Sequence, residues 1–441
     1  MQVSPAKPTT QEAVSRERAL QRLVTVFICT GLVFLLLPGT FLGVWNLLQI
    51  SSDRVVHAPS TAWIQAHGQA QIFGWIGTFI IGIGFYSLSK MGRLQPFAIK
   101  RGWQSWVLWT LGISLHWFTG VYAWQWRTML PLSAALQLAG FLLFFWTVRR
   151  HSAKPAASEQ RRPMEVWMRV VVAATFAFLA ALLWNLAVSL CASFAESTPT
   201  LPAPADGHLI LISAWGFLVM TVWGFNARWL PVFLGLPHPH PRGLLLAVAA
   251  LIAAVVAGVV GAPVVCSLLL IAAAILASWA LHVFQPSVQR PKLQGIHPSF
   301  PYFIRAAYVW LLVAAALSLF AALFDRNGGI SGASRHALAV GFLATMVFSI
   351  GPRILPAFCG MRVLFSKNLM FAALALLNLG CVLRVCCEIQ AYEHHVALAW
   401  QVLPVSAYLE LTAVGLFVLN LALTFLRPPA HLLVGGRASA R

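Results

Sequence analysis

Long apolar runs alternate with short polar stretches along almost the whole chain. An α-helix needs about 20 mostly apolar residues to cross a bilayer, and twelve segments meet this requirement: 23–46, 62–88, 103–122, 129–148, 166–192, 206–235, 243–260, 262–284, 303–324, 333–358, 366–388 and 399–426. The short Gly261-Ala262-Pro263 sequence marks the break between the seventh and eighth segments, so this pair is either a tight hairpin or one long broken element. The pattern predicts an all-α polytopic membrane protein with about 12 transmembrane helices.

Polar residues frame this apolar region at both ends. Residues 1–22 are rich in Arg and Glu, and the apolar run that follows them is too long for a cleavable signal peptide. We therefore expect a cytoplasmic N-terminal segment over 1–22, a single transmembrane domain over 23–426 and a cytoplasmic C-terminal tail over 427–441.

The charges give the predicted helices an orientation. The chain is 59% hydrophobic and 9% charged, with a net charge of +19, whereas soluble domains carry about 25% charged residues. Of the 30 Lys and Arg residues, three lie within or at the ends of spans, and most of the others lie in loops on the same side as the N-terminus. The opposite side holds Arg54, Arg127, Arg326 and Arg335. By the positive-inside rule both termini are cytoplasmic, and the positive charge faces anionic lipid headgroups rather than nucleic acid.

Three of the predicted helices share a pattern in which a histidine precedes a Gly-containing apolar run. These helices begin near His67, His208 and His336. In the last two, a Gly-Phe-Leu triplet that starts at Gly216 or Gly341 lies twelve residues before an Arg-x-Leu-Pro motif. The helices are the second, sixth and tenth spans, so the repeating unit is four helices. The sequence therefore predicts three four-helix repeats in the same orientation.

The same histidines are the strongest candidates for chemistry. The predicted topology places His67, His208 and His336 in the outer half of the membrane, together with His116 of the third span. Neutral imidazole ligates iron and copper, so the four side chains could hold a metal. Each one taken alone is equally compatible with a hydrogen-bonded structural histidine. Ionisable groups are costly in the membrane, however, and tend to be functional there.

Three charged residues could complete such a site. Arg335 and Arg384 lie near the outer ends of the tenth and eleventh spans, where they could pair with haem propionates or serve as ordinary interfacial arginines. Glu410 is the only acidic residue that we place well within a span. A carboxyl group at that depth is protonated, paired with a polar group or part of a proton path.

Two stretches of the chain resemble the NnrS family of bacterial membrane proteins. They are His67 to Gly74, with its Ile-Phe-Gly-Trp sequence, and the segment from Arg335 through Arg362. The resemblance implies an inner-membrane protein that contains haem, of the b type, and copper, and that protects against nitric oxide. Many members have His-x-His before the Phe-Gly of the second span. Here the first histidine is His67 and the second position is Gln69, which removes one candidate copper ligand.

The predicted twelve spans are also similar, more distantly, to the heme-copper oxidase catalytic subunit. There, spans 2 and 10 supply the axial ligands of a low-spin haem, which implies His67 and His336 in this chain. No His-His pair is present on the seventh predicted span and no His-x-His on the tenth, which argues against an oxygen-reducing enzyme. The implied ligand is nitric oxide or another small diatomic molecule. No motif identifies an electron donor or assigns a reaction. A transporter of a metal or a small anion is the alternative.

Overall fold

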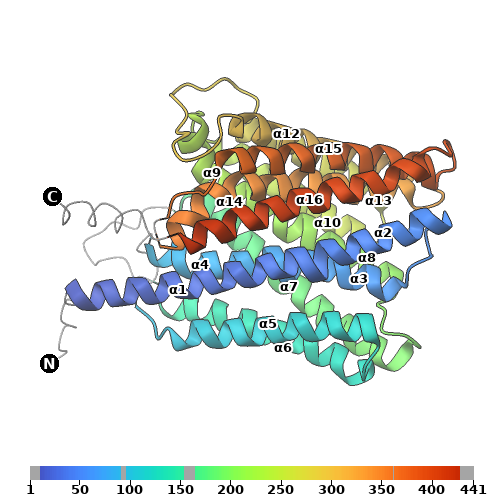
Figure 1. The fold of residues 1–441 in the computed structure, drawn as a ribbon, viewed down its shortest axis with the longest axis horizontal. Helices are drawn as coiled ribbons and strands as arrows, with labels where there is room; N and C mark the ends of the chain where they lie inside the picture. The colour runs from blue at the N-terminus through green and yellow to red at the C-terminus, as the bar shows by residue number, and fades with distance from the viewer. Residues whose placement is uncertain (1–9, 91–95, 153–163, 361, 428–441) are drawn as a thin grey trace.

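The computed structural model describes residues 10–90, 96–152, 164–360 and 362–427 (Figure 1). These residues fold into helices and loops, with no strand among them. Because several helices continue one another, we group them into rods, in which η denotes a π-helical segment. The first six rods are α1–η1–α2 (Thr10–Phe34, Leu35–Phe41, Leu42–Asp53), α3–η2–α4 (Thr61–Gln69, Ala70–Gly77, Thr78–Lys90), α5 (Lys100–Tyr122), α6 (Trp126–Arg150), α7 (Val166–Ala195) and α8–η3–α9 (Ala203–Ile210, Leu211–Val219, Met220–Leu234). The others are α10 (Pro241–Val259), α11 (Pro263–Ala280), α12 (Phe300–Phe324), α13–η4–α14 (Gly329–His336, Ala337–Ala344, Thr345–Phe358), α15 (Lys367–Tyr392) and α16 (Ala399–Leu426).

Every predicted span is helical in this structure. Within the described chain, 11 rods are long and apolar enough to cross a membrane. The remaining rod, α5, is a continuous helix of 23 residues, but its Trp, Ser, Gln and His side chains lower its hydropathy. The all-helical membrane fold is therefore confirmed, while the placement and orientation of the bilayer stay predictions.

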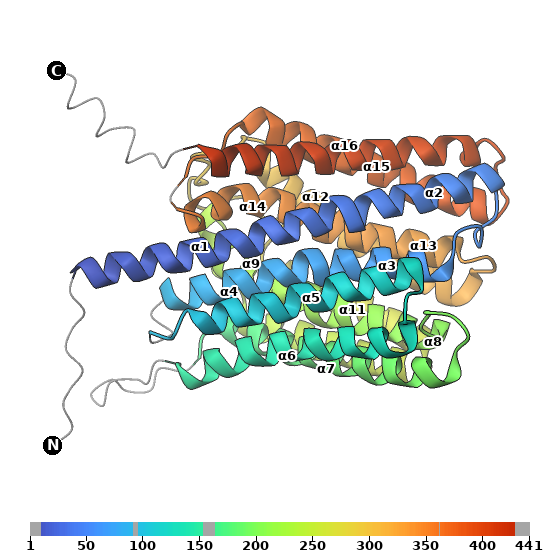
Figure 2. The same ribbon diagram turned by 60° about the horizontal axis from the view of Figure 1, so that its bottom comes forward.

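The rods run along the long axis of the molecule, which gives the bundle two distinct ends. The beginning of α1 and the end of α16 lie at one end, and α3, α8 and α13 lie together at the other (Figures 1 and 2). These three helices carry His67, His208 and His336. The histidine-bearing parts of the three related helices thus lie at the same end of the bundle, as the predicted topology requires.

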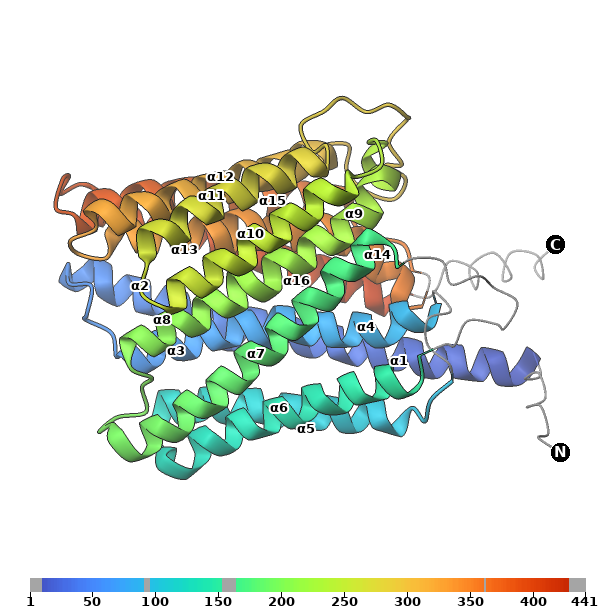
Figure 3. The same ribbon diagram turned by 180° about the vertical axis from the view of Figure 1, so that it is seen from behind.

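The uncertain pair of spans forms a hairpin. α10 and α11 lie side by side along the back of the bundle (Figure 3). Gly261 between them has a φ of 83°, a conformation that glycine adopts without strain. The amide of Ala262 donates to the carbonyl of Ala257 at 2.9 Å, and Pro263 begins α11. The hairpin interpretation is confirmed, and a single broken helix is excluded.

The three histidine-bearing rods form the centre of the bundle. In their most apolar stretches, 61%, 72% and 72% of the residues of the second, sixth and tenth rods are buried, against 28–50% in the other candidate spans. Their apolar side chains enclose a small cavity of about 100 Å³ between α4, α9 and α14. The remaining rods therefore surround an inner set of three helices.

The three central rods share a further feature that sequence did not predict. Each contains a π-helical segment, and η2, η3 and η4 begin at Ala70, Leu211 and Ala337, just after the respective histidines. A π-helical turn accommodates an extra residue and is frequent at functional sites. The fourth π segment, η1, contains Pro38, which cannot donate a backbone hydrogen bond.

The Arg-x-Leu-Pro motifs have different neighbours. The guanidinium of Arg228 lies 4.7 Å from the ring centre of Trp167 in α7, and that of Arg353 lies 4.3 Å from that of Phe233 in α9. Each arginine therefore makes a cation–π contact. α7 is the fifth rod and α9 belongs to the sixth, so these contacts do not recur at a four-helix interval, and the four-helix repeat remains a prediction.

Candidate functional site

His67 lies between the second rod and the first. Its Nδ1 is 2.8 Å from the carbonyl oxygen of Gly39 in η1, and its ring packs on Gly43 of α2 so closely that a Cβ there would lie 2.5 Å from the ring. A carbonyl oxygen only accepts hydrogen bonds, so Nδ1 carries the proton. In the neutral ring the lone pair is therefore on Nε2. Nε2 makes no hydrogen bond within the described residues.

His336 is held in a comparable way at the end of α13. Its Nδ1 lies 2.9 Å from Oε2 of Glu388 in α15 and 2.9 Å from the carbonyl oxygen of Gly332. Both neighbours are acceptors, which again fixes the proton on Nδ1. The His336 side chain is 29% exposed, so its other edge is not closed off by protein.

A buried ion pair supports this histidine. Glu388 Oε2 also lies 3.2 Å from Nε of Arg384, one turn earlier on α15. Glu388 is 3% exposed and Arg384 is 7% exposed. A Cβ at Gly332 would collide with Oε1 of Glu388, so glycine allows the carboxylate to approach α13. A charge buried this deeply needs a charged partner, and Arg384 provides it.

These groups form one cluster that joins three rods. His67 lies within electrostatic range of His336 and Arg384. Arg335 is exposed and acts on both Glu388 and Asp206 of α8. We call His67, His336, Arg335, Arg384 and Glu388 the histidine–arginine cluster. The structure thus brings together the four residues that the sequence indicated for haem, and adds Glu388.

His116 belongs to a separate group of buried polar side chains. Its Nδ1 lies 3.2 Å from the hydroxyl oxygen of Ser133. One turn further along α6, Gln137 accepts a hydrogen bond of 3.2 Å from Nε2 of Gln69. Gln69 is buried, and its side chain points toward α6, whereas His67 points toward the first rod. We call these four residues the Gln69 cluster.

His208 joins neither cluster through a contact in the described structure. Its ring meets the ring of Trp184 edge-on, with centres 5.6 Å apart. Among the described residues, no group of three or more His, Cys, Asp and Glu side chains is placed to hold a metal ion. The four predicted histidine ligands therefore divide among three places rather than forming one metal site.

Glu388 is the residue that sequence reasoning missed. Glu388 lies four residues before the end of α15 and is buried, so Glu410 is not the only acidic residue of the described helices that lies near the predicted site. The i, i+4 spacing of Arg384 and Glu388 on one helix face was the signal that could have found it.

Glu410 of α16 lies behind this pair. Its Oε1 is buried and has no hydrogen-bond partner in the part of the chain that the structure describes. It is within electrostatic range of His336, Arg384 and Glu388. Gly380 makes room for it, since a Cβ there would lie 2.8 Å from Cγ of Glu410. Glu410 is thus an outer neighbour of the histidine–arginine cluster.

Comparison with known proteins gives one clear match. A family model described as NnrS protein matches residues 24–428. The match covers the whole helical bundle apart from the start of α1, and both clusters lie within it. No curated protein matches the chain.

Proposed function

Because the chain belongs to the NnrS family, we propose that it is a haem-binding membrane protein that takes part in the cell's response to nitric oxide. One observation carries the proposal. His67 and His336 both have Nδ1 next to a fixed acceptor, which leaves Nε2 of each imidazole for a ligand. Histidines that bind metals usually donate their other ring N–H to a carbonyl or a carboxylate in this way.

The cluster suits haem b. His67 and His336 would hold the iron, and the exposed guanidinium of Arg335 is available to a propionate. Bound haem supplies an iron that accepts electrons and binds small diatomic molecules. The protein residues supply the remainder: Gly39 and Glu388 fix the two rings, and Arg384 keeps Glu388 ionised beside His336.

The number of histidines on the iron decides how nitric oxide could take part. If His67 and His336 both hold a haem, the group would supply electron transfer rather than a binding site for nitric oxide. Binding of nitric oxide would require that only one of the two histidines holds the haem. His336 is the one that could more readily be free of the haem, because its side chain is partly exposed.

Copper does not fit these residues. A copper site needs at least two or three nitrogen or sulfur donors at one point, and the described chain offers no such group of three. Of the four residues of the Gln69 cluster, His116 alone carries an imidazole. We therefore assign no step to copper.

The haem content of variants tests the proposal. The full chain, purified from haem-replete cells, should contain haem b in a pyridine haemochrome assay. His67→Ala and His336→Ala should each lower the haem-to-protein ratio, on the order of tenfold, since each removes a ligand. His208→Ala is the matched control, because the His208 ring packs against Trp184 and not against the histidine–arginine cluster in the described structure, and it should retain haem. Absence of haem from the unmodified protein, or equal loss in the control, would exclude the assignment.

A further inference from the structure

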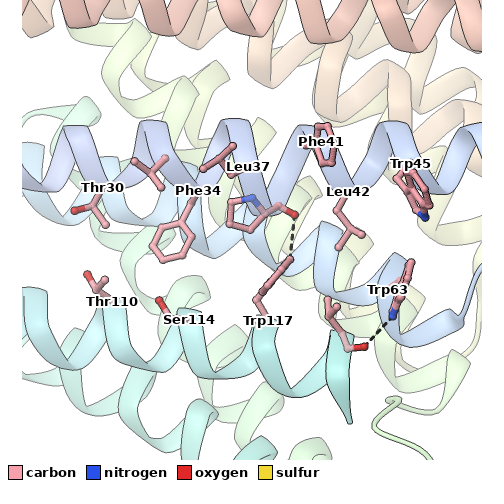
Figure 4. A pocket seen from close by; sticks show the side chains of 13 residues that line it. Thr30, Phe34, Leu37, Phe41, Leu42, Trp45, Trp63, Thr110, Ser114 and Trp117 are labelled. Atoms are coloured by element: carbon pink, nitrogen blue, oxygen red, sulfur yellow. Dashed lines mark hydrogen bonds between the residues drawn. The ribbon is translucent and has the colours of Figure 1, made fainter. Parts of the chain in front are cut away.

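A second site of interest opens on the side of the bundle. It is a cavity of about 690 Å³ between the first rod and α5, a volume typical of sites for small organic ligands. Figure 4 shows its lining, with Phe34 and Leu37 on one wall and Thr110, Ser114 and Trp117 on the other.

The open side of this cavity faces the surrounding membrane. Leu37, Phe41 and Trp45 line it and are about half exposed, at 58%, 57% and 48%. They lie on the outer face of a rod that qualifies as a membrane span. The opening is therefore continuous with the apolar belt that contacts lipid, and an occupant must enter from the bilayer.

Two tryptophans give the cavity rigid aromatic walls. The indole N–H of Trp63 donates to the carbonyl of Val121 at 3.0 Å, and that of Trp117 donates to the carbonyl of Pro38 at 3.2 Å (Figure 4). These bonds restrict the positions of both indole rings beside the cavity, where they can pack against a flat ligand. Aromatic rings gain from stacking beyond the burial of their area.

The cavity also contains polar groups that an acyl chain cannot satisfy. Oγ1 of Thr110 is buried and has no hydrogen-bond partner in the described structure. Ser114 lies one turn further on the same face of α5 and also lines the cavity. A buried hydroxyl without a partner is costly. The exposed Ser114 can bond a ligand oxygen directly, and Thr110 can do so once its hydroxyl turns toward the cavity.

We propose that this cavity binds an isoprenoid quinone. The ring would lie between the aromatic walls with one oxygen bonded to Thr110 or Ser114, and the isoprenoid tail would leave through the open side. The proposal deepens the proposed function, on which it rests, because it names the class of the lipid-soluble electron carrier that could serve a haem protein in the bilayer.

The cavity is joined to the histidine–arginine cluster through consecutive residues. The indole N–H of Trp117, which lines the cavity, donates to the carbonyl of Pro38. The carbonyl of the next residue, Gly39, accepts a hydrogen bond from Nδ1 of His67. Both carbonyls belong to η1. An occupant that contacts Trp117 or Pro38 therefore lies beside the segment that orients a proposed haem ligand.

Quinone binding can be measured independently of haem. The full chain in nanodiscs is titrated with decyl-ubiquinone, and quenching of tryptophan fluorescence gives the Kd. Thr110→Val combined with Ser114→Ala should raise Kd about fivefold, which corresponds to the loss of about one net hydrogen bond. Thr412→Val is the matched control, since Thr412 is on the exposed face of α16 and bonds the carbonyl of Tyr408. It should leave Kd unchanged.

A photoreactive azidoquinone then locates the site. The label should attach to peptides that contain residues 30–45, Trp63 or residues 110–121, and excess decyl-ubiquinone should prevent this. Labelling elsewhere, an unchanged Kd in the double variant, or equal competition by hexadecanol would overturn the proposal, the last by identifying an acyl-chain site. Haem content, measured on the same samples, reports separately on the proposed function.

Discussion

At the scale of single residues, the positions of the proposed ligands depend on small neighbours. Gly43 lets the ring of His67 lie against α2, and Gly332 lets the carboxylate of Glu388 reach α13 and His336. A side chain at either glycine would move a group that holds an imidazole. The cluster is therefore sensitive to substitutions that change no ligand.

The contact at Gly43 yields a matched pair of variants. A Cβ at Gly43 would lie 2.5 Å from the His67 ring, whereas nothing lies within 4 Å of a Cβ at Gly68. Gly43→Ala should displace the ring and lower the haem content severalfold. Gly68→Ala, next to the ligand, should leave the content unchanged. Haem loss in both variants, or in neither, would show that the contact with Gly43 does not position His67.

Gln69 provides a test of the missing copper ligand. The Gln69 side chain donates to Gln137, which lies one turn from Ser133, the partner of His116. An imidazole in place of Gln69 would therefore point toward His116 and its neighbours. Gln69→His should raise the copper content measured by mass spectrometry after dialysis. Gln69→Asn and the double variant Gln69→His, His116→Ala should not. An equal gain in the double variant would show that His116 is not a ligand.

Sequence alone could predict some of this site and not the rest. The position of a histidine before each Gly-containing run indicated His67 and His336, and depth in the span indicated Arg384. The sequence could not show that Gln69 faces α6 while His67 faces the first rod, because these directions depend on how the helices pack. Nor could it separate His208 and His116 from the histidine–arginine cluster.

At the scale of elements, the short helix α13 depends on one carboxylate at its start. Asp325 accepts hydrogen bonds from the backbone N–H groups of Gly328, Ile330 and Ser331, at 3.0, 3.3 and 2.8 Å. These amides would otherwise be unpaired at the helix N-terminus. His336 lies at the other end of the same helix, so this cap helps to place the ligand.

The same cap gives a pH dependence. Burial raises the pKa of Asp325, but the hydrogen bonds with Ser331, Glu393 and Ile330 together lower it by more, so the pKa lies below its usual value. A carboxyl group with a lowered pKa stabilises the fold at pH values above its unfolded pKa. This contribution is lost as the pH falls through the folded pKa.

Asp325→Asn should therefore destabilise the protein by about 1 kcal/mol near neutral pH. The difference between the variant and the unmodified protein should shrink as the pH is lowered. Thermal unfolding in detergent at several pH values measures this, with Asp53→Asn in an exposed position as the control. A difference that does not change with pH would contradict the assigned role of the carboxylate.

The π-helical segments could not be predicted from the hydropathy of the sequence. Hydropathy gave the spans, since apolar length decides whether a helix can cross a bilayer. It could not distinguish an α turn from a π turn, because the mean hydropathy of a segment does not depend on its hydrogen-bond pattern. Only Pro38 in η1 offered a chemical signal, as proline interrupts the regular hydrogen-bond series.

At the scale of the whole molecule, the predicted class is confirmed and its finer organisation is not. The all-helical bundle and the NnrS family are established. The four-helix repeat stays a prediction, with support from the three central rods and their π segments. The orientation in the membrane and the likeness to the heme-copper oxidase subunit also stay predictions, since no contact in the structure depends on them.

The central claim is that one haem iron lies between His67 and His336. Near-infrared magnetic circular dichroism of the oxidised, purified protein tests it most directly, because the band position identifies the axial ligands. We predict the band of two imidazole ligands in the unmodified protein and in His208→Ala, and its loss in both His67→Ala and His336→Ala. A haem-loaded protein whose band survives either substitution would contradict the claim.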